Sequence, residues 1–211
     1  MGREFMHIFD EWADSYETTV QGRDEQYKAV FEHYDDILEE VAKRTNGITI
    51  EFGIGTGNLT EKVLQKGVEL VAVEPNKSMR LVAEKRFPYL TIHDGDFLSF
   101  PKLGKVDSII SSYAFHHLTD EEKKRAFELY YSLLSESGEI VFADTMFVNE
   151  QAHEEMITTA KAKQFFDLAE DLNREYYTTV PNMKKILHET GYQVQFEKLN
   201  DFVWLTHAKK S

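Results

Sequence analysis

Residues 51–57 are EFGIGTG, with three glycines at alternate positions between an apolar run and a helical pattern. Glycines at this density favour a tight turn in which the backbone comes close to a neighbour that side chains would exclude. The preceding run, ITIEF at 48–52, has the β-branched and apolar residues of a strand. GNLTEKVLQKG, at 57–67, has apolar residues at helical spacing and a terminal glycine that stops the helix. The stretch predicts a strand, a turn and a helix in succession.

The same alternation continues along the chain. Strand-like runs are VELVAVE (68–74), YLTIHD (89–94), VDSIISS (106–112) and GEIVFAD (138–144), and helical patterns separate them, including one that ends before Gly138. Strands that alternate with helices predict a mostly parallel sheet with helices on both faces. The final stretch has two strand-like runs around Asn200 and Asp201, which predicts an antiparallel hairpin.

Composition limits the class of protein. The chain has 211 residues, 42% of them hydrophobic, which suits one globular domain. Its formal net charge of -13 argues against a nucleic-acid substrate, because phosphates would be repelled. Cysteine is absent and no run reaches membrane-spanning length, so we expect a cytoplasmic protein without a membrane segment.

Two phosphate-binding patterns fail at the glycine stretch. A P-loop requires Gly-Lys-Ser/Thr, whereas Asn58 and Leu59 follow Gly57. The nicotinamide pattern G-x-G-x-x-G finds Asn58 or Thr60 in place of its last glycine. The remaining pattern is an acid, Glu51, followed by three alternate glycines.

EFGIGTG resembles the first motif of the class I S-adenosylmethionine-dependent methyltransferases. S-adenosylmethionine carries a sulfonium and an ammonium and no phosphate, so a carboxylate suits it where a pyrophosphate would be repelled. The resemblance implies that this cofactor meets Glu51, Gly53, Gly55 and Gly57.

Two later motifs extend the resemblance. In VAVEPNKSM, it implies that Glu74 accepts the ribose hydroxyls and that Met79 lies against the adenine. Dinucleotide-binding dehydrogenases place an acid similarly, so Glu74 alone indicates only nucleoside binding. In GDFLSFP, at 95–101, the resemblance implies that Asp96 accepts the adenine amino group and that the backbone at Phe97 meets the ring. Asp-Gly-Asp is also a sequence that favours a turn, which is the alternative explanation.

The stretch SSYAFHHLTDEEK resembles the His-His loop of methyltransferases that act on small molecules. His116 or His117 is a candidate general base, because imidazole titrates near neutrality. The alternative is that one histidine positions the next helix, where Thr119 and Glu122 predict a capping box. Adjacent residues do not easily face one ion and no cysteine is present, so we predict no metal.

The covering segments resemble the family less specifically. FDEWADSYE, at 9–17, places an apolar stripe on one helical face, and the resemblance implies that Tyr16 approaches the methionine end of the cofactor. REYYTTV resembles the region after strand five, where Tyr176 and Tyr177 line an acceptor pocket or pack the cover. DNA adenine methyltransferases have a Pro-Pro-Tyr loop that is missing here, and cytosine enzymes need a cysteine.

Together these motifs predict one Rossmann-like class I methyltransferase domain, most similar to the YrrT-like bacterial group. The sheet is expected to have seven strands and a C-terminal antiparallel hairpin. We divide the chain into an N-terminal helical cover (1–44), a cofactor-binding core (45–146), a substrate-side cover or lid (147–180), and a C-terminal helix and hairpin (181–211). The expected function is methyl transfer from S-adenosylmethionine to a small molecule. A sensor that binds the cofactor without catalysis and a nicotinamide-dependent oxidoreductase are the alternatives, and the oligomeric state stays open.

Overall fold

The computed structural model describes residues 19–20 and 22–211. Its central sheet has the strand order β3-β2-β1-β4-β5-β8-β7, and the short β6 pairs with β5 outside this path. The strands are β1 (Ile48–Phe52), β2 (Glu69–Val73), β3 (Ile92–His93), β4 (Val106–Ser112), β5 (Leu134–Phe147), β6 (Thr178–Thr179), β7 (Tyr192–Lys198) and β8 (Val203–Lys210). The α-helices are α3 (Tyr34–Lys43), α4 (Asn58–Gln65), α5 (Lys77–Arg86), α6 (Asp120–Leu133), α7 (Glu150–Ala162), α8 (Phe166–Arg174) and α9 (Val180–Glu189).

The strands from β3 to β5 are parallel and place their carboxyl ends at one edge of the sheet. β1 lies between β2 and β4, and the strand order reverses direction there, since β2 and β3 extend to one side and β4 and β5 to the other. In open α/β sheets, ligands bind outside the carboxyl ends of the strands at such a reversal. The topology therefore places the glycine turn, which follows β1, at the expected binding position.

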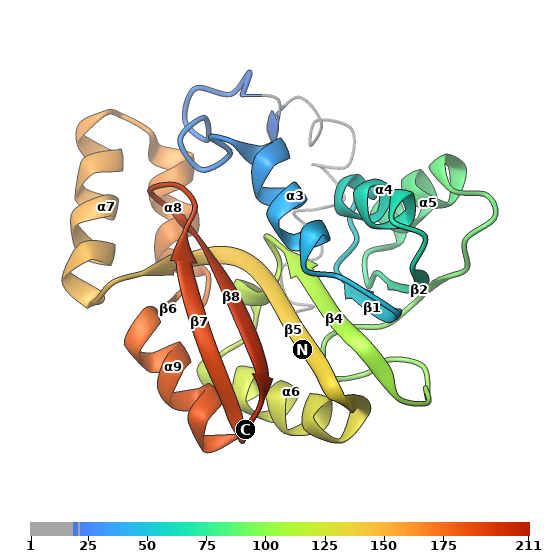
Figure 1. The fold of residues 1–211 in the computed structure, drawn as a ribbon. Coiled ribbons are helices and arrows are strands. Elements are labelled where there is room, and N and C mark those ends of the chain that lie inside the picture. The colour runs from blue at the N-terminus through green and yellow to red at the C-terminus, as the bar shows by residue number, and fades with distance from the viewer. Residues whose placement is uncertain (1–18, 21) are drawn as a thin grey trace.

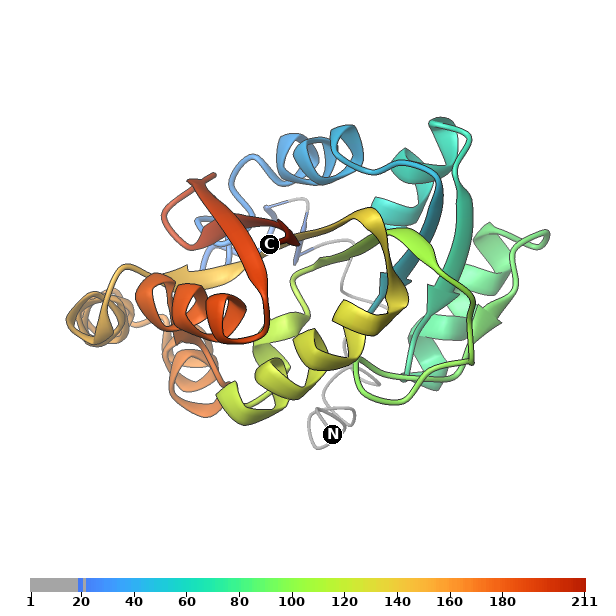
Figure 2. The same ribbon diagram turned by 60° about the horizontal axis from the view of Figure 1, so that its bottom comes forward.

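Helices cover both faces of the sheet, as predicted. α3 and α4 lie on one face and α6 and α9 on the other (Figures 1 and 2). Each face has its own apolar core: Val41 and Val63 pack beneath α3 and α4, while Phe127 and Leu187 pack beneath α6 and α9. These side chains are fully buried because the sheet is covered on both sides.

The C-terminal hairpin is confirmed. β8 pairs antiparallel with β5 and with β7, which gives the sheet its antiparallel edge. In the turn, the Asn200 side chain accepts bonds from the backbone N–H groups of Phe202 and Val203 and donates to the carbonyls of Val30 and Glu32. One buried side chain thus shapes the turn and ties it to the segment before α3.

The boundary between α6 and β5 differs from the sequence prediction. The helix was expected to continue to Gly138, but it ends at Leu133 and the strand begins at Leu134. Leu134 pairs with Val106 of β4, and its carbonyl accepts bonds from the ammonium groups of Lys105 and Lys210. These long-range contacts outweigh the local helical pattern of the segment.

Two helices follow β5 on the predicted substrate side. The helical stretch expected over 149–173 divides into α7 and α8, and Gln164 between them has a positive φ of 62°. Among residues 19–20 and 22–211, no helix is long and apolar enough to cross a membrane. The predicted stripe at 9–16 lies outside the described residues, and the division of the chain into four segments stays a prediction.

Candidate functional site

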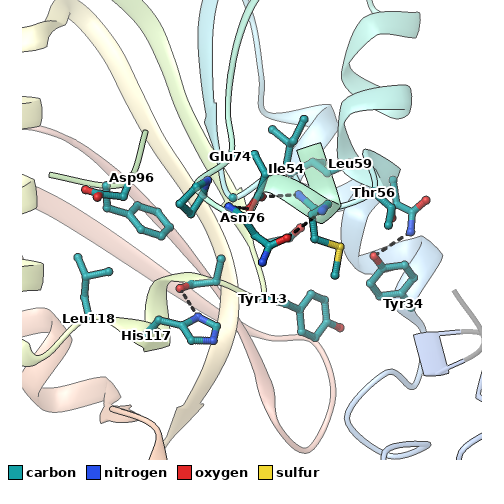
Figure 3. A pocket seen from close by; sticks show the side chains of 18 residues that line it. Tyr34, Ile54, Thr56, Leu59, Glu74, Asn76, Asp96, Tyr113, His117 and Leu118 are labelled. Atoms are coloured by element: carbon teal, nitrogen blue, oxygen red, sulfur yellow. Dashed lines mark hydrogen bonds between the residues drawn. The ribbon is translucent and has the colours of Figure 1, made fainter. Parts of the chain in front are cut away.

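A cavity opens at the carboxyl ends of β1, β2 and β4. Its walls are the glycine turn after β1, the segment from Glu74 to Met79 after β2, Asp96 and Phe97 after β3, and the segment from Ser112 to Leu118 after β4. Tyr34 closes one side (Figure 3). Motifs that are far apart in the sequence therefore meet around one space.

Glycine is favoured at the three positions for different structural reasons. All have positive φ angles, 65° at Gly53, 56° at Gly55 and 91° at Gly57, so side chains would be strained at each position. A Cβ on Gly53 would approach the Ala114 side chain to 2.8 Å, and one on Gly57 would meet the Phe87 ring. Around Gly55 a Cβ would meet no atom of residues 19–20 and 22–211 within 4 Å. Gly53 and Gly55 line the cavity, whereas Gly57 is not part of its wall and serves packing at the start of α4.

Glu74 lies at the cavity wall with both carboxylate oxygens engaged. It accepts the backbone N–H of Gly55 and of Asn76, each at 2.8 Å. Burial raises the pKa of Glu74 to about 7, although both of these bonds favour the charged form. A carboxylate has roughly four acceptor positions, so two bonds leave capacity for ligand hydroxyls.

Glu51 lies in the interior rather than at the cavity wall. Its side chain, on β1, accepts the Thr60 hydroxyl of α4 at 2.8 Å, and the residue is 1% exposed. Burial raises the pKa of Glu51 to about 8, and the nearby Glu74 adds to the increase. The contact predicted between Glu51 and a cofactor is not visible in the wall and stays a prediction.

The remaining predicted cofactor residues line the cavity. Asp96 Oδ1 accepts the backbone N–H groups of Leu98 and Ser99 at 3.0 and 2.9 Å, so the turn expected from this motif is present together with its place in the wall. Phe97 contributes to both the wall and the core, where its ring packs against Phe52. Met79, on α5, is buried beside the Asn76 cap.

Sequence analysis missed two aromatic residues of the wall. Tyr113, directly after β4, has a φ of 51°, an unusual conformation for a residue with a side chain. Its ring lies 5.4 Å from that of Tyr34 and 5.1 Å from that of Phe31, so the three rings form one cluster beside the cavity. The position of Tyr113 at the carboxyl end of a parallel strand was the available signal, and Tyr34 had none.

The two histidines differ in environment. His116 donates its backbone N–H to Asp144, and its ring lies between two carboxylates: Nδ1 is 2.5 Å from Asp144 Oδ1 and Nε2 is 3.1 Å from Glu175 Oε2. Burial by itself lowers the pKa of His116, but the two carboxylates outweigh this effect and raise it to about 10. His116 is therefore an imidazolium held in place at neutral pH.

His117 lines the cavity, whereas His116 does not. Its Nδ1 lies 2.8 Å from the Ala114 carbonyl, which can only accept, so Nδ1 carries the proton and Nε2 is the basic nitrogen. Burial, reinforced by the charge on His116, lowers the pKa of His117 to about 4. The ring is neutral at pH 7 and faces the cavity beside Leu118 (Figure 3).

Other predictions for this region have mixed outcomes. Thr119 and Glu122 form the predicted capping box at the start of α6. Tyr177 packs against the His116 ring at 5.0 Å and donates to Glu175, while Tyr176 is not part of the cavity wall. Tyr16 lies outside the described residues.

Comparisons with known proteins agree with the fold. A family model described as a methyltransferase domain matches residues 50–138. Among solved structures, the complex of DhpI with SAH superposes with a TM-score of 0.72 at 12% identity, covering 100% of this chain and 97% of that one. Magnesium protoporphyrin IX methyltransferase (ChlM) from Synechocystis with bound SAM gives a TM-score of 0.67 at 15% identity, covering 98% and 97%. The protein has the class I methyltransferase fold.

Closer relatives define the family. The chain is 50% identical to an uncharacterized methyltransferase of Bacillus cytotoxicus and 49% identical to one of Anoxybacillus flavithermus. Each match extends over 211 residues and covers 100% of both chains. The chain belongs to this bacterial methyltransferase family, which overturns the alternative of a nicotinamide-dependent oxidoreductase.

Proposed function

We propose that this protein transfers the methyl group of S-adenosylmethionine to a small-molecule acceptor. The observation that carries the proposal is the cavity itself, where the glycine turn, Glu74 and Asp96 meet at the carboxyl edge of the sheet. Membership of the methyltransferase family supports the reaction class. A cytoplasmic location remains part of the proposal, supported by the absence of cysteine.

The residues of the wall fit this cofactor. The space around Gly55, where a Cβ would meet no atom of the described residues within 4 Å, leaves room for a ligand against the backbone. Glu74 retains acceptor capacity for ribose hydroxyls, and Asp96 and Met79 line the same cavity, which supports the proposed contacts with the adenine. Glu51 lies behind the turn, and its contact with the cationic end of the cofactor is proposed from the sequence motif alone. When bound, S-adenosylmethionine supplies an already activated methyl group.

The contribution of the chain is alignment of two reactants away from bulk water. The acceptor side of the cavity has the rings of Tyr34 and Tyr113 together with Leu118 and His117, a mostly apolar wall with few polar groups. Such a surface suits a small molecule. The net charge of -13 supports an acceptor other than a nucleic acid.

His117 is the better candidate for accepting a proton from the acceptor. Its Nε2 is unprotonated at neutral pH, and its ring lines the cavity. His116 has both ring nitrogens engaged with carboxylates and serves to position the loop. We therefore retain His117 as a candidate catalytic base and assign His116 a positioning role. Tyr16 stays a candidate from the sequence only.

The test combines cofactor binding with methyl transfer. Calorimetry should show binding of S-adenosylmethionine and of S-adenosylhomocysteine, and incubation with methyl-labelled cofactor and fractionated small metabolites should move label into one fraction. Glu74→Gln should weaken both, while Glu69→Gln, an exposed glutamate at the other end of β2, is the matched control. Binding without transfer of label across broad metabolite fractions would instead favour the sensor.

A further inference from the structure

Three potential metal ligands converge beside the cavity. His116 and His117 lie on the short 3₁₀ helix η2 (Phe115–His117), and Glu175 follows α8. One ligand atom from each lies within 4.8 Å of the other two. His116 Nε2 is 3.1 Å from Glu175 Oε2, and His117 Nε2 is 3.8 Å from Glu175 Oε1.

The 3₁₀ turn explains how adjacent histidines face one point. Their ring centroids are 4.2 Å apart with planes inclined by 35°, so the rings lie side by side instead of diverging as expected from the sequence. The tight turn after Ala114 directs both side chains toward Glu175. The geometric argument against a shared ion therefore does not hold at this turn.

Each histidine is oriented through its other ring nitrogen. His116 Nδ1 bonds to the Asp144 carboxylate and His117 Nδ1 to the Ala114 carbonyl. Tyr177 donates its hydroxyl to Glu175 Oε2 at 2.7 Å. Metal-binding histidines usually have such a carboxylate or carbonyl partner, which fixes the tautomer and aims Nε2 at the ion.

We propose that His116, His117 and Glu175 bind a divalent transition-metal ion at the wall of the cavity. Two imidazoles and one carboxylate suit zinc and its neighbours in the first transition series better than magnesium or calcium. Ligand atoms at about 2.1 Å from a tetrahedral ion are about 3.4 Å apart. The 3.1 and 3.8 Å separations bracket that distance, and the three ligand atoms all lie within 4.8 Å of one another.

Two carboxylates with little exposure flank the His116 ring. Asp144 Oδ1 lies 2.5 Å from Nδ1, and Glu175 Oε2 lies 3.1 Å from Nε2. Buried charge is costly unless it is compensated, so a dication bound to Glu175 and the two histidines would offset the negative charge of these carboxylates.

Three protein ligands leave a further coordination position. Because His117 is part of the cavity wall, the ion would lie beside the space in which the acceptor is proposed to bind. With the ion bound, His117 Nε2 is a ligand and not a general base, and a hydroxyl or thiol coordinated to the ion would instead lose its proton to solvent more readily. This role rests on the proposed function, whereas metal binding itself does not.

The experiment titrates the chelator-treated, full-length protein with Co²⁺ and then displaces it with Zn²⁺. We expect one equivalent of Co²⁺ with the visible absorption of a nitrogen- and oxygen-ligated site. Removing an outer hydrogen-bond partner of a metal ligand typically costs 10–100-fold in affinity, so loss of a ligand should cost at least about 100-fold in Glu175→Gln. The control is His33→Gln, an exposed histidine near Glu32 and Asp36, which should bind like the wild type.

Several outcomes would overturn the proposal. One is that the wild-type protein does not bind Co²⁺ stoichiometrically. The other is that Glu175→Gln folds and binds Co²⁺ with unchanged affinity. If circular dichroism shows that this variant does not fold, His117→Gln takes its place with the same criterion. Metal binding without methyl transfer would contradict the proposed function alone, and methyl transfer by a protein that binds no metal would contradict this inference alone.

Discussion

Glu51 couples the stability of the protein to pH, and Glu51→Gln tests how. In the folded protein this carboxyl has a pKa of about 8, raised from an ordinary value of 4.5 chiefly by burial. The folded state therefore binds the proton more tightly than the unfolded chain does. The stabilisation is complete below pH 4.5 and is lost as the pH rises to about 8.

The size of the effect follows from the two pKa values. They differ by about 3.5 (8 minus 4.5), and each unit corresponds to about 1.4 kcal/mol, so the upper limit is about 5 kcal/mol. Glutamine has nearly the same shape, remains neutral and still accepts the Thr60 hydroxyl. The variant should become progressively more stable than the wild type between pH 5 and 8, by several kcal/mol at the upper end.

The measurement is the free energy of unfolding from urea titrations followed by circular dichroism at several pH values. Glu74 contributes a decline of the same sign in the wild type, since its pKa is raised to about 7. The difference between the unfolding free energies of the variant and the wild type gives the contribution of the Glu51 carboxyl, including its repulsion of Glu74. Glu69→Gln, at an exposed position, is the control variant. Parallel curves for Glu51→Gln and the wild type would refute the assignment of a buried, largely protonated carboxyl.

Three further predictions concern the cavity and its support. The affinity for S-adenosylmethionine should fall as the pH drops below about 7, because Glu74 must be ionised to accept two hydroxyls. Calorimetry at several pH values should show that Glu74→Gln no longer has this decline. At pH 8 the affinity of the variant should be about 10–100-fold weaker than that of the wild type. Gly57→Ala should lower the free energy of unfolding by about 2 kcal/mol or more, because of its positive φ and the Phe87 ring behind it. Gly55→Ala should lose only the roughly 1–2 kcal/mol that its positive φ costs, and it should also reduce cofactor affinity. Equal stability and affinity losses in both variants would be inconsistent with their different surroundings. Asn200→Ala should cost about 2–3 kcal/mol in urea unfolding, since it leaves backbone groups of the hairpin turn without partners, and a loss below about 0.5 kcal/mol would show that water replaces these bonds.

Sequence patterns predicted the parallel part of the fold because its signals are local. β1 and β4 match their predicted ranges, since buried strands are short runs of β-branched residues between helical patterns. The start of β5 was missed because pairing of Leu134 with β4 depends on residues far along the chain. Local propensity does not contain such contacts.

In the candidate site too, residues with a local sequence signal were predicted, and residues placed by distant parts of the chain were missed. The glycine turn and Glu74 follow directly from motif spacing, and both occupy the cavity wall. Asp144 had an available signal, because it ends the predicted run GEIVFAD at the carboxyl edge, as Glu74 ends VELVAVE. Glu175 had none, since its place beside the histidines depends on the path of the chain after α8.

The glycine stretch also shows why a motif does not assign a role to each of its members. Its alternating glycines suggested one ligand against all three. A Cβ would meet Ala114 at Gly53 and the Phe87 ring at Gly57, but no atom of the described residues at Gly55. Packing within the protein therefore requires glycine at 53 and 57, whereas Gly55 borders open space. The segments after β4 and after α5 lie against the turn, and the Gly55 N–H donates to Glu74. A turn held by the protein in this way reduces the ordering cost of binding, and since glycine has no titrating side chain, the pH-sensitive part of cofactor affinity rests on Glu74.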